Sequence, residues 1–484
     1  MGDNLKKNMM GALAWSSINI VGTQFIQLIV GIILARILVP EDFGTIGVLF
    51  IFIGLSTVLI DGGFGQGLIR KQDTTEKDLS TIFYLNFLMS IALYTIMYFG
   101  APFISIFFAI PELTTISRVL FLSVILFSFY FIQQVQLYKK HDYKSLAIIN
   151  IVSIGFSGTL SAILALKGFG VWALVVQQLV FHIAKALLFP FFLRWKPIKA
   201  FTLNTIKELW SFSVNLLGQT MLNVIFNNIY ILIIGKFYPI QQVGYFTQAN
   251  KYSETVNTAT QSILFSGTFP VFAQIQDDQP RLLRVYRRLA TSISLVTFPI
   301  VFFLIVTAYP LFITVFTDKW IFSVLFFQTL ILANIFTPLY TININILNVR
   351  GESKQTLKLE IFKKTMIVLS IICCFSFGIE IMLIGLLISN FLAYGGSMVL
   401  LKKSINHYFR HQILDFSKIL IIVVFIGFIV YLINFTQLGN QFILALQAGS
   451  FLILYLIALK LFFPENLTEA INGILNKLKS LVTT

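Results

Sequence analysis

Polar side chains recur every three or four residues inside several otherwise apolar stretches of the chain. Residues at this spacing lie on one face of a helix. Such a row can bind a ligand rich in hydroxyl groups, or it can join helices through hydrogen bonds. The small serines of the row that begins at Asn150 favour helix packing. The rows are Ser16–Asn19–Thr23–Gln27, Asn150–Ser153–Ser157–Ser161, Gln178–His182–Lys185, Asn215–Gln219–Asn223–Asn227 and Asn334–Thr337–Thr341–Asn345–Asn348.

A few charged residues lie inside these same stretches. Lys251 and Glu254 are three apart in segment 243–273, and Lys185 lies in the middle of segment 169–192. A charge at the centre of a bilayer costs roughly 2.5–3.5 kcal/mol on insertion scales, so it faces water, a cavity or a partner. The lysines could hold an anion, whereas Lys251 and Glu254 could also form an ion pair that locks the helix. Glu254 and Asp61 are the acidic candidates for taking up a coupling proton or Na⁺.

Motifs for catalysis or for a bound cofactor are weak. His407 and His411 are four apart, but they lie in a basic stretch without the glutamate of a zinc-binding helix, and His141 and His182 add no metal-ligand spacing. The glycine-rich stretch 61–67 lacks the Gly-Lys-Ser/Thr ending of a nucleotide-binding loop, so it predicts a tight turn. We therefore expect no cofactor, no metal and no enzymatic activity.

The composition indicates which elements hold these residues. The 484 residues are 57% hydrophobic and only 11% charged, with a mean hydropathy of +0.86, whereas soluble proteins carry about 25% charged residues. Backbone in lipid must be helical, with about 20 apolar residues per span. The sequence predicts an all-α membrane bundle with fourteen spans at 11–35, 43–60, 79–99, 113–137, 145–166, 169–192, 208–235, 243–273, 289–316, 321–347, 357–378, 381–401, 417–435 and 440–463.

The basic residues predict how the spans are oriented. The net charge of +15 is spread over short clusters between the spans, which argues against a nucleic-acid-binding domain. Most Lys and Arg fall in alternate loops, and such loops stay in the cytoplasm. Lys236 falls in a loop outside the cytoplasm, whereas the cluster Arg281–Arg288 falls in a cytoplasmic loop. The polar segment 243–273 between them must therefore cross the membrane. We expect both termini in the cytoplasm.

A shift of 200 residues shows an internal repeat. Asn19, Thr23 and Gln27 then fall on Gln219, Asn223 and Asn227, while Arg36 falls on Lys236 and Gly44 on Gly244. Both copies cross in the same direction, which predicts two parallel lobes related by an axis along the membrane normal, with a pathway between them. We expect a first lobe (1–192), a linker (193–207), a second lobe (208–401), two further helices (402–463) and a C-terminal interfacial helix (464–484).

Seven ordered blocks resemble the Wzx-type flippases, the polysaccharide-transport branch of the multidrug/oligosaccharidyl-lipid/polysaccharide exporter superfamily, and among these the colanic acid and teichuronic acid exporters. The resemblance covers roughly residues 1–400. The blocks are LARILVPEDFGTIG (34–47), DGGFGQGLIRKQD (61–73), KKHDYKSLAIINI (139–151), GFGVWALVVQQL (168–179), IIGKFYPIQQVGYFTQAN (233–250), FPVFAQIQDD (269–278) and RGESKQTLKLEIFKK (350–364).

This resemblance implies two six-helix lobes that open alternately to each side of a bacterial inner membrane. It also implies a cargo of undecaprenyl-pyrophosphate-linked oligosaccharide, with membrane lipids, a coupling H⁺ or Na⁺ and the polysaccharide polymerase machinery as partners. We expect the cargo to contact Asn19, Thr23, Lys185, Asn215, Gln219, Asn223 and Lys251, and the coupling ion to contact Glu254 and Asp61. In the resting protein Lys251 and Glu254 would neutralise each other until the pyrophosphate arrives.

Three other functions stay open. A cation-coupled drug antiporter would need an acidic cavity. A membrane-bound saccharide polymerase or acyltransferase would need a sizeable outer loop, or a catalytic histidine with a partner. A scaffold that transports nothing would leave the polar rows without a ligand.

Overall fold

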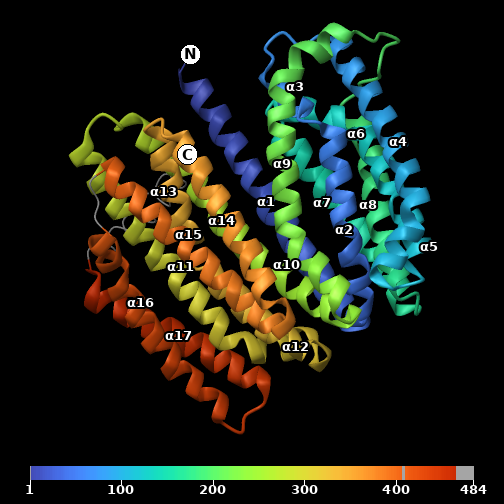
Figure 1. Ribbon diagram of the computed structural model, residues 1–484. Helices are drawn as coiled ribbons and strands as arrows, with labels where there is room; N and C mark the ends of the chain where they lie inside the picture. The colour runs from blue at the N-terminus through green and yellow to red at the C-terminus, as the bar shows by residue number, and fades with distance from the viewer. Residues whose placement is uncertain (1, 406–408, 465–484) are drawn as a thin grey trace. The chain divides into compact units, whose positions relative to one another are not determined.

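The computed structural model describes residues 2–405 and 409–464, and within these ranges the chain is helical and contains no strand (Figure 1). It forms two compact units, Met1–Thr247 and Gln248–Thr484. The expected all-α fold is confirmed. The predicted C-terminal interfacial helix and His407 lie outside the described residues.

The first unit is built from nine helices and the beginning of a tenth. Its core lies where α4, α6, α7 and α8 pack together around Tyr130, Ile132, Leu146 and Phe189. The helices are α1 (Gly2–Ile37), α2 (Pro40–Asp61), α3 (Phe64–Arg70), α4 (Glu76–Phe108), α5 (Leu113–Leu120), α6 (Leu122–Lys139), α7 (Tyr143–Leu166), α8 (Val171–Phe192), α9 (Leu203–Phe237) and α10 (Ile240–Gln274), of which α10 continues into the second unit.

The second unit holds the remaining helices. Here α11 packs against α12, α16 and α17, and α15 packs against α12, α13 and α14. Its helices are α11 (Gln279–Phe316), α12 (Ile321–Ala333), α13 (Thr337–Val349), α14 (Ser353–Cys374), α15 (Ile379–Ile405), α16 (Phe409–Tyr431) and α17 (Asn440–Phe462), with short 3₁₀ turns at Asp318–Trp320, Phe375–Phe377 and Leu432–Phe435.

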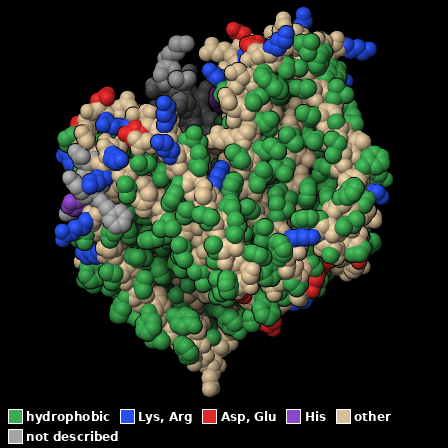
Figure 2. Space-filling model, in the orientation of Figure 1, with side chains coloured by type: hydrophobic (Ala, Val, Ile, Leu, Met, Phe, Trp, Pro, Cys, Tyr) green, Lys and Arg blue, Asp and Glu red, His purple; other side chains and the backbone are tan. Residues whose placement is uncertain are grey.

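Each of the fourteen predicted spans coincides with one helix or with two helices in succession. Twelve of them are long and apolar enough to cross a membrane. The other two are α10, which contains Lys251 and Glu254, and α14, which contains Glu360 and Lys363. Figure 2 shows hydrophobic side chains over much of the visible surface, as lipid-facing helices require, while Lys and Arg on the first unit gather near the end where α3 and α4 meet. We call this the basic end of the unit.

Breaks interrupt several of the spans, and one of them lies at Phe121 between α5 and α6. After α2, Gly62 and Gly63 have φ of 55° and 76°, a conformation that glycine adopts at little steric cost. A tight turn thus follows the second span as predicted, but it is limited to these two glycines, because residues 64–67 already belong to α3. In the second unit the turn Asn334–Phe336 separates α12 from α13, and Pro338 follows it. The carbonyl of Ala333, left free by this break, accepts a hydrogen bond from Asn390 Nδ2 at 3.0 Å.

The boundary between the units lies further along the chain than the predicted boundary between the lobes. The first unit includes α9, because the predicted linker (193–207) is hydrogen-bonded to the start of α4. Trp195 Nε1 donates to Glu76 Oε2 at 2.6 Å, Ile198 N to Ser80 Oγ at 3.0 Å, and Thr202 N to Thr81 Oγ1 at 3.0 Å. Packing and the internal repeat thus divide the chain differently, and the lobe assignment stays a prediction.

Candidate functional site

The longest exposed polar row lies on α9. Asn215, Gln219, Asn223 and Asn227 all have exposed side chains, although α9 is long and apolar enough to span a membrane. At 1.5 Å per residue the row is about 18 Å long, more than half of a hydrocarbon core of about 30 Å. Polar side chains at this depth are unfavourable in lipid. The row therefore presents amide donors and acceptors to water or to a polar ligand.

The matching row on α1 is partly used for helix packing. Asn19 is half-buried and accepts a hydrogen bond from Asn150 Nδ2 of α7 at 3.0 Å, and Thr23 Oγ1 donates to the Asn19 carbonyl at 2.5 Å. Gln27 on the same face is exposed. Asn19 thus joins two helices, as the packing interpretation of these rows requires.

The row on α13 is also largely structural. Asn345 is buried and donates from Nδ2 to Thr268 Oγ1 at 3.0 Å. Thr341 donates from Oγ1 to the carbonyl of Thr337 at 3.0 Å, within the helix. Asn334, at the break before α13, is the member of this row that lines a pocket.

Lys185 lies in the interior of the first unit, with its side chain 7% exposed. Its ammonium donates to Gln134 Oε1 at 3.3 Å and lies 4.9 Å from the centre of the Tyr130 ring and 5.1 Å from that of Phe181. Beside it the Tyr130 hydroxyl and His182 Nδ1 are 2.8 Å apart. No carboxylate among the described residues forms an ion pair with Lys185. Amide and aromatic groups of α6 and α8 stabilise this charge instead.

The expected ion pair between Lys251 and Glu254 is not present among the described residues, so that prediction was wrong. Both side chains are exposed on α10. Lys251 Nζ lies 6.0 Å from the centre of the neighbouring Tyr252 ring, while Glu254 interacts with Asn257 one helical turn further on and with the charge of Lys363 on α14. At a spacing of three residues a helix allows such a pair but does not require it, and here the carboxylate has partners elsewhere.

The partners of Glu254 belong to a charged cluster that the sequence analysis missed. Lys363 interacts with both Glu254 and Glu360, and its Nζ lies 5.1 Å from the centre of the Tyr340 ring. The Tyr340 hydroxyl donates to Glu360 Oε1 at 2.9 Å. The available signal was the low hydropathy of both α10 and α14, since two polar helices that are predicted to cross a membrane have reason to place their charges together.

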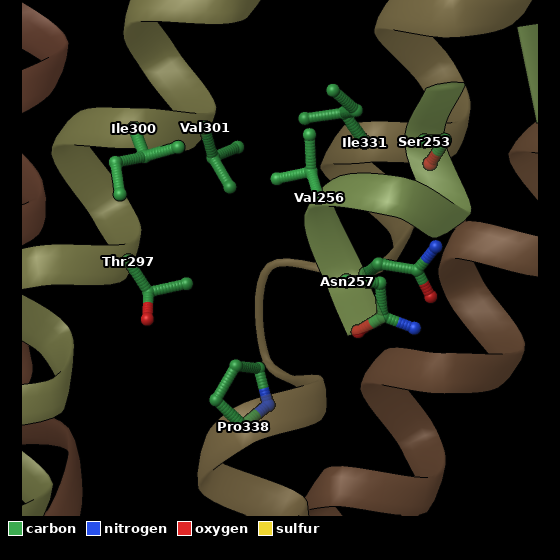
Figure 3. A pocket seen from close by; sticks show the side chains of 9 residues that line it. Ser253, Val256, Asn257, Thr297, Ile300, Val301, Ile331 and Pro338 are labelled. Carbon is green, nitrogen blue, oxygen red and sulfur yellow. The ribbon is translucent and has the colours of Figure 1, made fainter. Parts of the chain in front are cut away.

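A pocket of about 330 Å³, including its opening, lies in the second unit beside this cluster. Figure 3 shows Ser253 and Asn257 of α10 facing it from one side and Thr297 of α11 from the other, with Pro338 below. The hydroxyls of Ser253 and Thr297 are buried without a hydrogen-bond partner. Buried polar groups of this kind normally bind water or an ion. The pocket is far too small for a glycolipid, but it can hold water or a small ion.

Asp61 has a structural contact at the break between α2 and α3. It is half-buried, and its Oδ1 accepts the backbone N–H of Gly65 at 2.9 Å. A Cβ on Gly65 would lie 2.8 Å from the same oxygen. Asp61 therefore stabilises the first turn of α3.

Among the described residues, twelve helices that are long and apolar enough to span a membrane, an exposed polar row on one of them, and charges within α10 and α14 together define a membrane transport protein. The chain belongs to a family described as polysaccharide biosynthesis protein, which matches residues 33–325. The teichuronic acid biosynthesis protein TuaB of Bacillus subtilis is 24% identical over 352 residues, covering 72% of this chain and 73% of the relative. The succinoglycan biosynthesis transport protein ExoT of Rhizobium meliloti is 23% identical over 318 residues, covering 66% and 64%.

The fold is also that of a solved flippase. The superposition on the structure of the lipid II flippase MurJ covers 93% of this chain and 99% of the flippase chain, with a TM-score of 0.71 and 17% sequence identity. At this identity the similarity establishes the fold alone.

Proposed function

We propose that the protein moves an undecaprenyl-pyrophosphate-linked oligosaccharide, a repeat unit of a capsule, O-antigen or exopolysaccharide, across the bacterial inner membrane by alternating access. The observation that carries this proposal is the exposed row of amides on α9. Membership of the polysaccharide biosynthesis family and the two relatives that act in polysaccharide synthesis and transport support it.

The chemistry of the row suits a sugar chain. An amide offers both donors and acceptors, and four amides at successive turns can replace the water around several hydroxyl groups. The lipid tail needs no polar path and can stay in the bilayer. The exposed ammonium of Lys251 is available for the pyrophosphate, whose attraction to a cation grows as water is excluded. Lys185 would bind it only after its contacts with Gln134 and the rings had opened.

The same proposal sets the orientation. The basic end of the first unit would face the cytoplasm, together with both termini, because loops rich in Lys and Arg remain there. The opposite end, where α1 leads into α2 and α9 into α10, would face the periplasm; we call it the outer end. In this orientation the protein transports the product of cytoplasmic glycosyltransferases towards the polymerase and is itself no enzyme.

We propose that Glu254 couples transport to an ion gradient, with a partner different from the one that the sequence indicated. Glu254 lies between Asn257, which lines the pocket, and Lys363 of α14. A proton or Na⁺ that neutralised the carboxylate would weaken its attraction to Lys363 and so release α10 from α14. The pocket hydroxyls of Ser253 and Thr297 supply oxygen atoms of the kind that hydrate or ligate such an ion. Asp61, bonded to backbone, is the weaker of the two coupling candidates.

The experiment is deletion of the gene followed by extraction of lipid-linked saccharides. We expect one lipid-linked oligosaccharide to accumulate and the surface polymer to disappear, and the wild-type gene to restore both. The combined variant Asn215→Ala, Gln219→Ala and Asn223→Ala should fail to restore them, whereas Leu222→Ala, which removes an exposed apolar side chain from the same helix, should succeed. Normal lipid-linked saccharides together with increased sensitivity to cationic drugs would instead support the antiporter.

A further inference from the structure

The short helix α3 packs directly against the first half of α9 in the first unit (Figure 1). A Cβ on Gly63, at the start of α3, would lie 2.6 Å from the carbonyl oxygen of Ser213, so the two helices meet backbone to backbone. At the other end of α3, the ammonium of Lys139 donates to the carbonyl of Leu68 at 3.2 Å. Packing and hydrogen bonds therefore fix the last turn of α3, which carries Arg70.

Arg70 lies over Phe212 of α9, and its charge is not neutralised. Its Cζ is 4.9 Å from the centre of the Phe212 ring, a distance typical of a cation–π contact. The Arg70 side chain is exposed and forms no ion pair or hydrogen bond with the described residues. The carboxylate of Glu208, one turn before Phe212, is bound by Lys71 at 2.8 Å. The N–H donors along the edge of the Arg70 guanidinium are thus available to an anion.

Phe212 belongs to the same face of α9 as the exposed amides. It precedes Asn215 by three residues, which is about 4.5 Å along the helix axis. Asn215 Nδ2 donates to the carbonyl of Ser211 at 3.1 Å, so Asn215 Oδ1 is the atom that a ligand meets. This oxygen can accept from a sugar hydroxyl but cannot bind an ionised pyrophosphate, whose oxygens only accept. A cation followed by amides matches a ligand that carries a pyrophosphate at one end and hydroxyl groups beyond it.

We propose that Arg70 binds the pyrophosphate of the lipid-linked cargo while the sugars contact the amides of α9. The inference rests on the proposed function and adds to it a binding residue for the cargo's head group. The planar guanidinium can bind two phosphate oxygens at once, and Phe212 holds it at the start of the amide row. The site lies entirely within the first unit, whereas Lys251, the other cation available for the pyrophosphate, belongs to the second. In the proposed orientation Arg70 is at the cytoplasmic end, where the cargo is loaded.

Binding of fluorescent undecaprenyl pyrophosphate to the full-length protein in lipid nanodiscs tests the site. We expect Arg70→Gln to weaken binding by about tenfold or more, because a charge-assisted hydrogen-bonded pair is lost. Arg70→Lys should restore only part of it, since an ammonium lacks the planar fork. Phe212→Leu should weaken binding by about two- to fivefold through loss of the ring. Lys207→Gln is the matched control, because it removes an exposed charge from the same end of α9 but off the face of the row.

The outcomes separate the binding site from the function. Unchanged binding by Arg70→Gln that melts at the wild-type temperature would overturn the site, and so would an equal loss in Lys207→Gln, since net charge alone would then explain it. Displacement of the probe by phosphatidylglycerol as effectively as by unlabelled undecaprenyl pyrophosphate would make Arg70 a site for anionic bilayer lipid and overturn it too. If binding depended on Arg70 but the wild-type gene failed to clear lipid-linked saccharide from the deletion strain, the site would stand and the proposed function would be wrong.

Discussion

Lys71 links three segments at the basic end of the first unit, and Lys71→Ala should destabilise that unit measurably. Its ammonium lies 3.1 Å from Asp78 Oδ2 of α4 and 2.8 Å from Glu208 Oε2 of α9. Asp78 also accepts from Thr205 Oγ1 at 2.5 Å and from the backbone N–H of Thr75 at 3.0 Å. Lys71 and Asp78 thus hold the first turn of α9 against the start of α4.

The two halves of this bridge differ in strength. The Asp78 side chain is only 7% exposed, and a hydrogen bond to a charged, poorly solvated group contributes about 1.5–3 kcal/mol. The Glu208 side chain is 58% exposed, and such ion pairs contribute about 0.2–1 kcal/mol. We expect Lys71→Ala to lower the free energy of unfolding by about 2–3 kcal/mol, and Glu208→Ala by less than 1 kcal/mol.

Unfolding of the purified protein in mixed micelles measures these differences. The control is Lys77→Ala, since Lys77 is an exposed lysine in the first turn of α4, next to Asp78. The hydrogen bond to Glu208 raises the pKa of Lys71 above its usual value. A raised lysine pKa stabilises the fold at all pH values below the unfolded pKa of about 10.4 and ceases to do so as the pH rises through the folded one. The effect should therefore be constant from pH 6 to 9. A loss no larger than that of Lys77→Ala would refute this account of the basic end.

Three further predictions concern the other contacts. The Asn19–Asn150 hydrogen bond should appear in a double-mutant cycle as a coupling of about 0.5–1.5 kcal/mol in unfolding; zero coupling would mean that α1 is held otherwise. Asn390→Leu should leave the Ala333 carbonyl without its donor and lower the free energy of unfolding by about 1–3 kcal/mol, whereas an unchanged value would show that another group satisfies the carbonyl. Glu254→Gln should keep cargo binding but reduce the dependence of export on the ion gradient, and unaltered dependence would place coupling elsewhere.

The fold could be predicted closely because its main determinant, the alternation of apolar runs with basic clusters, is a property of the sequence itself. Each span needs a long apolar run, and lysine and arginine mark the ends, so the flanking charges predict a crossing even for the polar segment that forms α10; the structure confirms that this segment is a helix. The predicted 113–137 span is two helices, α5 and α6, and the break at Asn334–Phe336 was likewise not foreseen. Such breaks depend on partners distant in sequence, such as Asn390 for the Ala333 carbonyl.

The site was less accessible to sequence reasoning. Periodicity located the amides of α9 on one face, and that face is exposed. Periodicity alone could not distinguish this row from that of α1, where Asn19 bonds to Asn150 across 131 residues. It also suggested Lys251 as the partner of Glu254 on proximity in sequence, whereas the carboxylate interacts with Lys363. Tertiary packing decides which helix faces another, and a local sequence pattern carries no information about that choice.

Flipping by the purified protein tests the central claim most directly. The protein is reconstituted into vesicles that carry a fluorescent undecaprenyl-pyrophosphate oligosaccharide in both leaflets, and a membrane-impermeant glycosidase is added outside. We expect the protein, with an ion gradient applied, to expose nearly all of the oligosaccharide to the enzyme, and empty vesicles to expose about the half that begins outside. Protection of the inner half in the presence of correctly folded protein would contradict the account.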